Sequence, residues 1–233
     1  MQKPVSAESV RIIDVSHTIE AGMITYHGLP APRICDYLSR EASRDRYETG
    51  TEFLISEITM VGNTGTYVDS PFHRYEDGAD LADLPLSSLV NLDTIIVRFD
   101  PGEKRAITSV TLDERDVKGR AILFNTGWDR HWRSSQYHTG HPYLTGGVAQ
   151  QLVEMGVVLV GIDSFNIDCT DDGARPVHST LLRAGIPIVE HLRGLNEAPE
   201  TGGRFFAAPV KLRAFGSFPV RAFVLEFARR PAL

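Results

Sequence analysis

Cysteine is scarce in this chain of 233 residues, and long apolar runs are missing from it. The two cysteines, Cys35 and Cys169, are far apart and lack a nearby partner, which excludes a disulfide framework and a zinc-knuckle spacing. No apolar run approaches the ~20 residues that span a bilayer, and the N-terminus lacks the apolar segment of an export signal. These absences predict a cytoplasmic protein without a membrane partner.

Basic charge is also in short supply, because the formal net charge is -6. Such a chain has no positive field with which to neutralise a phosphate backbone, so we expect no nucleic-acid partner. The arginines Arg40, Arg44 and Arg46 alternate with acids, which indicates a solvated face of mixed charge. Gly-rich phosphate loops and a Gly-x-Ser-x-Gly elbow are absent too, so nucleotide and serine-hydrolase chemistry lack support.

What is present is the composition of an ordinary globular protein, with 42% hydrophobic residues and no linker-like stretch. We therefore expect a single domain over residues 1–233. Short runs rich in Val, Ile and Phe predict strands. Most of these runs are continuously apolar, which is typical of strands that are covered on both faces. The predicted strands are 94–99, 121–124, 157–162, 186–189 and 222–227.

Helix signals lie between these predicted strands. Residues 148–155 have apolar residues at helical spacing and are followed by Gly156, a typical left-handed helix end. Residues 178–184 are followed in the same way by Gly185, and residues 81–90 indicate a helical turn. Helix, glycine and strand in succession predict an α/β fold in which a mixed, partly parallel sheet is flanked by helices.

The residues most suited to chemistry lie in the segment 63–73, Asn-Thr-Gly-Thr-Tyr-Val-Asp-Ser-Pro-Phe-His. Because its residues are small, hydroxylated or turn-forming, we expect loops here and no packed strand. Asp69 and His73 are four residues apart, so the carboxylate either orients the imidazole or joins it in binding a metal.

A second polar cluster follows the predicted strand 157–162, at the edge where sites form in open α/β sheets. The cluster consists of Asp163, Ser164, Asn166, Asp168, Asp171 and Asp172, and His178 follows further on. Glu190 ends the next apolar run, where burial is expected. A buried carboxylate needs a partner, which a metal or a histidine would supply.

The pattern as a whole resembles the cyclase family, which includes bacterial kynurenine formamidases, isatin hydrolases and some polyketide cyclases. The family signature reads His-x-Gly-Thr-His-x-Asp-x-Pro-x-His, and Gly65, Thr66, Asp69, Pro71 and His73 match it. The likeness covers nearly the full length. Its other landmarks are residues 14–19, 126–128, 161–163 and 208–212, and the pair His178 and Glu190.

The resemblance implies a swivelling β/β/α barrel-like fold, a homo-oligomer (dimer or tetramer) and metal-dependent hydrolysis. It implies that Asp69, His178 and Glu190 hold a divalent metal ion and that His73 is the general acid/base. In that scheme the metal lowers the pKa of water and polarises the substrate carbonyl.

The two early signature histidines are replaced here by Asn63 and Tyr67, which are weak metal ligands at neutral pH. Three hypotheses follow, in order of preference. The first is one divalent ion (Mn, Zn or Mg) held mainly by oxygen donors. The second is metal-independent cyclase or isomerase chemistry on a polyketide-like substrate, in which Asp69 and His73 move protons and Tyr67 donates to an oxyanion. The third is a non-catalytic small-molecule-binding protein.

We therefore predict a hydrolase that cleaves a C–N bond (amide or lactam) or an ester or lactone bond. The expected small-molecule substrate is cyclic or aromatic. His73, Asp69 and Tyr67 are the predicted catalytic residues, and Asp69 is also a predicted metal ligand. Residues predicted to contact the substrate are Trp128 (which follows a buried strand), Asn63 and Tyr26.

Overall fold

A curled, mixed sheet of nine strands forms the body of the protein. The computed structural model describes residues 10–100, 102 and 104–227, and the sheet has the order β1-β13-β11-β5-β7-β9-β10-β4-β12. The four strands β5, β7, β9 and β10 are parallel to one another, and the remaining pairs are antiparallel. The strands are β1 Val10–Asp14, β4 Tyr67–Asp69, β5 Leu92–Arg98, β7 Ala121–Asn125, β9 Leu159–Ile162, β10 Ile188–Glu190, β11 Thr201–Phe206, β12 Ser217–Pro219 and β13 Phe223–Phe227.

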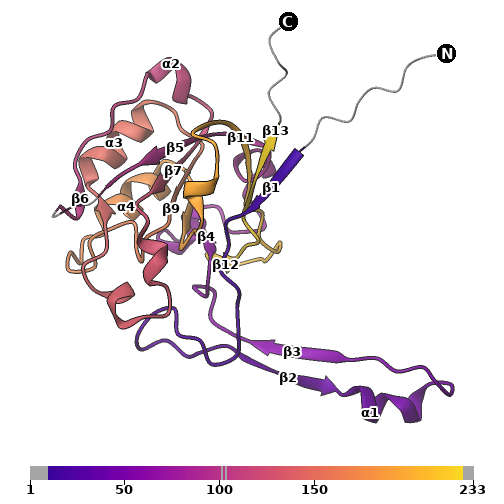
Figure 1. Ribbon diagram of the computed structural model, residues 1–233. Helices are drawn as coiled ribbons and strands as arrows, with labels where there is room; N and C mark the ends of the chain where they lie inside the picture. The colour runs from indigo at the N-terminus through magenta and orange to yellow at the C-terminus, as the bar shows by residue number, and fades with distance from the viewer. Residues whose placement is uncertain (1–9, 101, 103, 228–233) are drawn as a thin grey trace, which may run out of the picture.

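Helices cover one face of the parallel strands (Figure 1). The longest are α3 Gly146–Glu154 and α4 Pro176–Arg183, which precede β9 and β10 in the chain. The short parallel pair β6 Ala106–Ile107 and β8 Tyr143–Leu144 lies beside them. The other helical elements are α1 Arg40–Ser43, α2 Glu114–Val117 and six 3-10 turns: Arg44–Arg46, Pro71–His73, Leu86–Ser88, Trp128–His131, Ser135–His138 and Leu195–Glu197.

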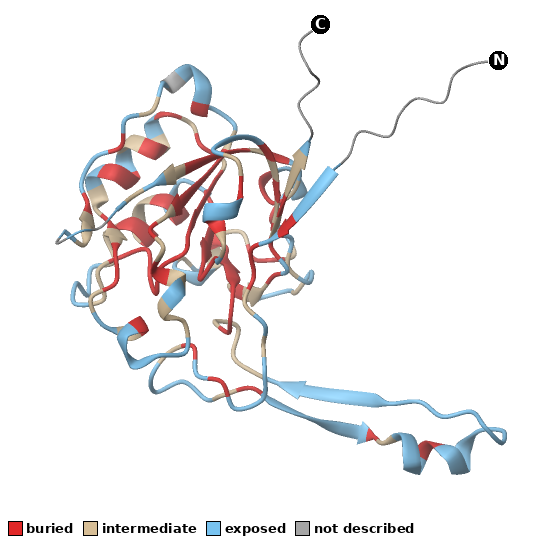
Figure 2. Ribbon diagram, in the orientation of Figure 1, coloured by how far each residue is buried: buried red, intermediate tan, exposed pale blue. Residues whose placement is uncertain are grey.

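The central strands are buried (Figure 2), and apolar side chains pack on both sides of the sheet, which explains the continuously apolar runs in the sequence. Ile122 and Phe124 of β7 pack toward the helices with Leu152 and Leu181. Leu123, which alternates with them, packs on the opposite side. The predicted α/β fold with a mixed sheet is confirmed.

The strands predicted from apolar runs are present as β5, β7, β9, β10 and β13. The two predicted helices are α3 and α4, and the glycines that follow them, Gly156 and Gly185, have the expected positive φ of 70° and 78°. The predicted helical turn at 81–90 is confined to a 3-10 turn at Leu86–Ser88. No helix in the described part of the chain is long and apolar enough to cross a membrane.

The prediction that residues 63–73 contain no packed strand is wrong. Tyr67–Asp69 form β4, which lies between β10 and β12 and is buried at all three positions. This strand is stable there because Tyr67 donates to Glu190 on β10 and one carboxylate oxygen of Asp69 accepts from Ser217 on β12. The following 3-10 turn, Pro71–His73, holds His73 at the end of this strand.

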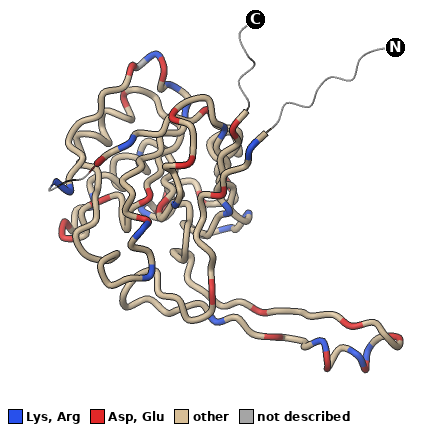
Figure 3. Tube along the Cα trace, viewed as in Figure 1, with Lys and Arg blue, Asp and Glu red and all other residues tan. Residues whose placement is uncertain are grey.

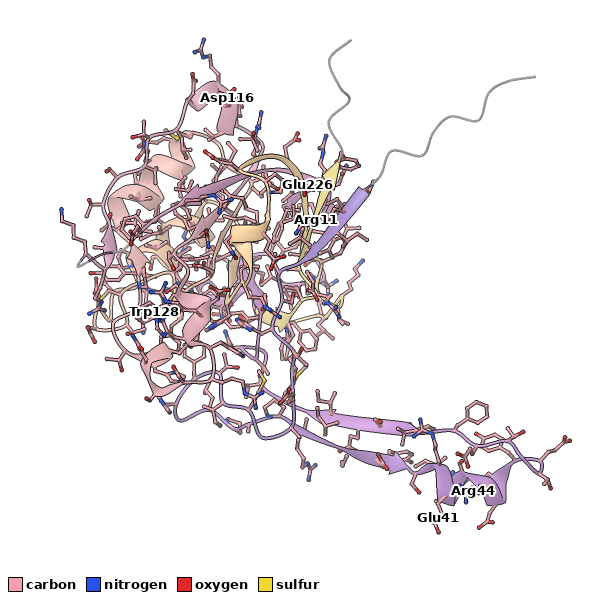
Figure 4. All side chains as sticks on the ribbon, viewed as in Figure 1. Arg11, Glu41, Arg44, Asp116, Trp128 and Glu226 are labelled. Carbon is pink, nitrogen blue, oxygen red and sulfur yellow. The ribbon has the colours of Figure 1, made fainter. Side chains whose placement is uncertain are left out.

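The second sheet is a two-stranded hairpin that projects from the body (Figures 1 and 2). Its strands are β2 Arg33–Leu38 and β3 Ile55–Thr59, and residues 33–59 are called the arm below. All but one of its strand residues are exposed. Residues of both charge signs lie on it (Figure 3), and Glu41 and Arg44 lie near its far end (Figure 4). The mixed-charge segment around Arg40 and Arg44 is therefore solvated, as predicted.

Candidate active site

Strand register builds the site from three adjacent strands. Tyr67 and Asp69 are two residues apart on β4, so their side chains lie on the same face of the sheet. Glu190 of β10 pairs directly with Tyr67, and Ser217 of β12 pairs directly with Asp69. Directly paired residues have neighbouring side chains, and this pairing brings together groups that are more than a hundred residues apart in sequence.

Two of these strand residues, Asp69 and Glu190, form a candidate metal centre with His178 of α4. Asp69, His178 and Glu190 each offer a ligand atom, and these atoms lie within 4.8 Å of one another. His178 Nε2 is 3.6 Å from Asp69 Oδ2 and 3.7 Å from Glu190 Oε1. Two ligands each ~2.1 Å from one cation, at an angle of ~120°, are ~3.6 Å apart. The spacing therefore fits a divalent cation.

One carboxylate oxygen of Asp69 is suited to binding a divalent cation. Its Oδ1 accepts a short hydrogen bond from Ser217 Oγ, but its buried Oδ2 has no hydrogen-bond partner within the described chain. Burial alone raises the pKa of Asp69, but His73, His178 and Ser217 lower it below its ordinary value. An ionised carboxylate with one unpaired buried oxygen is a suitable metal ligand.

His178 is held in a fixed orientation by Asp168. The Asp168 carboxylate accepts from the backbone N–H groups of Val177 and His178 at the start of α4, and it lies 2.7 Å from His178 Nδ1. A proton on Nδ1 leaves Nε2 facing Asp69 and Glu190. Burial lowers the pKa of His178, but the carboxylates of Glu190, Asp168 and Asp69 outweigh burial and raise it to about 10. Without a cation, His178 is therefore an imidazolium.

Glu190 is fully buried and accepts several hydrogen bonds. Ile167 N–H donates to Oε1 at 2.7 Å, and Tyr67 OH donates to Oε2 at 2.5 Å. Tyr26 OH lies 3.2 Å from the same Oε2 and 2.9 Å from Tyr67 OH. Burial, then Glu190, raise the pKa of Tyr67 well above its ordinary value, so the phenol keeps its proton. The sequence predicted that Tyr67 donates a hydrogen bond to an oxyanion of the substrate. In this structure the Tyr67 hydroxyl donates its hydrogen bond to Glu190.

His73 lies at the open side of the site, with 37% of its side chain exposed. Its Nδ1 is 2.8 Å from Ser217 Oγ, and the same hydroxyl donates to Asp69 Oδ1. Since the hydroxyl proton goes to Asp69, His73 must donate through Nδ1 to the Ser217 oxygen. This fixes the tautomer in which His73 Nε2 carries a lone pair.

A cavity of about 270 Å³ opens over these groups. It is lined by His73, His178 and Glu190, and by the predicted residues Asn63, Tyr67 and Tyr26. Asp69 lies beneath it, fully buried. The structure thus brings seven of the eight predicted site residues to one place.

Trp128 is the eighth, and it does not line this cavity. It lies in the body on the 3-10 turn Trp128–His131 (Figure 4) and packs with Tyr137 and Phe165. Its Nε1 donates to the backbone carbonyl of Tyr137 at 3.0 Å. Partly buried Tyr26 packs against this cluster, so Trp128 supports a wall of the cavity from behind.

Ser217, which contacts Asp69 and His73, carried no sequence signal, and neither did Arg74 and Arg175, which line the cavity. Ser217 has no spacing relation to Asp69 or His73 and is placed only by the pairing of β12 with β4. Asp168 and Asn166 belonged to the predicted polar cluster, but their contacts with His178 and Tyr26 follow from the turn after β9.

Comparisons with known proteins give consistent matches. The family model described as "Putative cyclase" matches residues 13–169. A kynurenine formamidase from Bacillus cereus is 28% identical over 213 residues, which cover 91% of this chain and 96% of that protein. A kynurenine formamidase from Paracidovorax citrulli is 29% identical over 171 residues, or 72% of this chain and 78% of that protein.

Solved structures match over nearly the whole chain as well. One described as "Potential Metal-Dependent Hydrolase With Cyclase Activity" is 26% identical with a TM-score of 0.74, covering 96% of this chain and 100% of that one. Isatin hydrolase A from Labrenzia aggregata is 20% identical with a TM-score of 0.76, covering 93% of each chain. At that identity the second likeness is evidence for the fold alone.

Proposed function

Since this chain belongs to the cyclase family, whose model matches more than half of its 233 residues, we propose that it hydrolyses an amide bond in a small aromatic molecule. The family predicted from the sequence is confirmed, and the relatives confirm that the chain is a hydrolase. The observation that carries the proposal is the buried group of Asp69, His178 and Glu190 beneath a cavity that His73 faces. Ester and lactone bonds present the same kind of carbonyl to these groups.

The residues that would hold one divalent ion are Asp69 through Oδ2, His178 through Nε2 and Glu190 through Oε1. The unpartnered Asp69 Oδ2 and the 3.6 and 3.7 Å spacings support this assignment. When bound, such an ion supplies Lewis-acid chemistry, because it lowers the pKa of water and polarises a carbonyl group. One imidazole and two carboxylates form a harder donor set than three histidines, which favours Mn or Mg over a histidine-rich zinc site.

His73 is the proposed general acid/base. Ser217 holds its Nδ1 proton, so Nε2 is free to take a proton from an attacking water. The same nitrogen can then give that proton to the departing amine nitrogen. Proton transfer of this kind contributes about 10²–10⁴-fold to rates. Asp69, through Ser217, orients the ring.

Tyr67 and Tyr26 have positioning roles in this scheme. Tyr67 fixes Glu190 by donating to Oε2, and Tyr26 is anchored by contacts with Asn166 and His191. Tyr67 occupies a position at which the family signature has a histidine. In this chain the Tyr67 phenol would therefore orient the metal ligand Glu190 and would not bind the metal ion itself. Asn63 lines the cavity and has a carboxamide suited to hydrogen bonding with an amide substrate.

The charge state of His178 favours a second candidate, metal-independent acid/base chemistry. An imidazolium that lies between Asp69 and Glu190 neutralises part of their charge without a cation. In that case His73 alone would move protons during a cyclisation or isomerisation.

The deciding experiment uses formanilide, a small aromatic amide, and protein stripped with a chelator. We expect hydrolysis to stop on chelation and to return with about one equivalent of Mn²⁺, Zn²⁺ or Mg²⁺. As a matched control, Asp69→Asn keeps the size of the side chain and should not recover with added metal. Full activity of the stripped protein would overturn the metal-dependent function and support the second candidate.

A further inference from the structure

The loop before the arm, residues 20–32, forms part of the cavity over the candidate metal centre. Tyr26 and Leu29 of this loop line the cavity. Its two ends are joined by a hydrogen bond from the Gly22 N–H to the carbonyl of Pro32 at 2.9 Å, so it folds back on itself as a compact surface loop. The loop therefore does more than connect β1 to the arm.

The two halves of the loop differ in how firmly they are attached to the body. In the first half, Thr25 Oγ1 accepts a backbone hydrogen bond at 2.9 Å, and Tyr26 OH lies 3.2 Å from Glu190 Oε2. In the second half, the side chains of residues 27–31 make no hydrogen bond or ion pair within the described chain, and residues 27–30 are all exposed. Gly28, with a φ of 88° and open space where a Cβ would lie, gives this half backbone freedom.

One ring contact fastens the second half to the body. The imidazole of His27 lies against that of His138, with 4.1 Å between the ring centroids and 47° between the ring planes. His138 in turn packs edge-on against Phe165 and Tyr137, with centroid distances of 5.0 and 5.9 Å. The contact therefore joins the exposed half of the loop to the packed aromatic cluster behind Tyr26.

No acid near this pair of rings offsets a positive charge. Among the described residues, no carboxylate oxygen lies within 4.0 Å of either ring, whereas His73 and His178 both have such partners. Burial, followed by the charge of His27, lowers the pKa of His138 below its ordinary value of 6.5. Neutral imidazoles pack as other aromatic rings do, but two imidazolium ions at this distance repel each other. The contact is therefore fully stable above about pH 6.5 and weakens as the pH falls through the lowered pKa.

The other titratable groups around His138 do not supply the missing negative charge. Burial raises the pKa of Tyr137 well above its ordinary value, so this neighbouring phenol keeps its proton. His141 and His191 pack against Phe165 from other segments, with centroid distances of 5.3 and 6.0 Å. Neither of these two imidazoles has a carboxylate oxygen within 4.0 Å among the described residues. A proton on His138 is thus left uncompensated on every side.

We propose that residues 27–31 form a lid over the cavity and that His27 and His138 form its acid-sensitive latch. With both rings neutral, the lid stays against the body and Leu29 covers the cavity. Protonation of both rings drives them apart, and the weakly attached segment moves away from the cavity. Tyr26 stays anchored by its hydroxyl, so opening leaves the candidate metal centre in place. The proposal does not depend on the hydrolase function.

Nuclear magnetic resonance of leucine methyl groups tests the latch without any substrate. The methyl signals of Leu29 report the closed lid, because Tyr26 and Tyr67 line the same cavity and their rings shift the signals of nearby groups. Repulsion between two charges about 4 Å apart in water corresponds to about a 5-fold change in an equilibrium. We therefore expect the open fraction to rise about 5-fold or more between pH 8 and pH 5, while the signals of Leu123 in β7 stay unchanged.

Two results would overturn the proposal. Leu29 signals that stay at one position from pH 8 to pH 5 would show that acid does not release the segment. Signals at the position of a free leucine already at pH 8 would show that the segment is not a closed lid.

Three variants separate the latch from a general effect of acid. In His138→Phe, a protonated His27 meets an aromatic face that attracts it, so the response of Leu29 to acid should disappear. His27→Gln changes an exposed residue and should leave the lid open at both pH values. His131→Phe is the matched control, since the His131 ring packs on Trp128, and it should keep the wild-type response. Equal responses to acid in His138→Phe and His131→Phe would remove His138 from the latch.

Discussion

The body and the arm differ in the burial of their apolar residues. In β7, Ile122, Leu123 and Phe124 are all fully buried, because helices cover one face of the sheet and its own curl covers the other. In the arm, Tyr37 is 73% exposed and Ile58 is 49% exposed. An isolated two-stranded hairpin is marginally stable in water, and clustered exposed apolar residues mark interaction surfaces. The candidate site and the packed core thus belong to the body, and the arm leaves its apolar side chains exposed.

The largest expected effect is on turnover, and it belongs to the body alone. His73→Ala removes the acid/base group and should lower formanilide hydrolysis by about 10²-fold or more. Ser217→Ala, which removes only the hydroxyl that orients His73, should cause a smaller loss. Tyr37→Ser in the arm serves as the control and should retain much more activity than His73→Ala. Unchanged turnover in His73→Ala, with the fold intact by circular dichroism, would remove this residue from the mechanism.

A stability measurement compares the two regions directly. Leu123→Ala leaves a cavity in the packed core and should lower the free energy of unfolding by about 2–5 kcal/mol. Ile58→Ala deletes an exposed side chain of the arm and should change it by less than about 0.5 kcal/mol. Chemical denaturation of dilute protein gives both values. Equal losses would show that the arm packs as tightly as the core.

The arm also sharpens the homo-oligomer implied by the family resemblance, which remains a prediction. If a second copy covers the arm, replacing Tyr37 and Phe53 together with serine should shift a dimer or tetramer toward monomer in light scattering. Ile12→Ser is a matched control, because Ile12 is 68% exposed on β1, in the body. A monomeric wild-type protein, or an oligomer that both variants preserve, would contradict this role of the arm.

The smallest expected effect is a pH dependence of the metal-free body. The pKa of His178 is raised from 6.5 to about 10, so its protonation stabilises the folded state. This contribution is fully present below about pH 6.5 and is lost as the pH rises through about 10. Melting temperatures of chelated protein should fall across this window, and His178→Gln should flatten the slope. A melting temperature that rises with pH there would refute the ion-pair network.

Sequence patterns predicted the body of the fold because each of its central strands has a local apolar pattern of its own. β5, β7 and β9 are continuous apolar runs, and Gly156 and Gly185 mark the ends of the helices before β9 and β10. β4 lacked such a signal, because its polar side chains are balanced by partners 123 and 148 residues away. The arm was missed for a related reason: its strands bury neither face and so have no core pattern to read.

The site residues that could be predicted from the sequence are those with charged or titratable side chains, because such side chains are costly to bury without a partner. Glu190 was picked out by its charge at an apolar position and Asp69 by the family signature, the resemblance added His178 to them, and the three do come together. Ser217 was not, since serine is common and its position depends on the register of β12 against β4. The location of Trp128 behind Tyr26 likewise depends on packing that no local pattern encodes.

The most direct test of the central claim is the metal content of the purified protein by elemental analysis. The geometry of Asp69, His178 and Glu190 predicts about one equivalent of a divalent ion, lost in Asp69→Ala and retained in the arm variant Tyr37→Ser. Protein that contains no metal, takes none up on addition and still hydrolyses its amide substrate would contradict the claim.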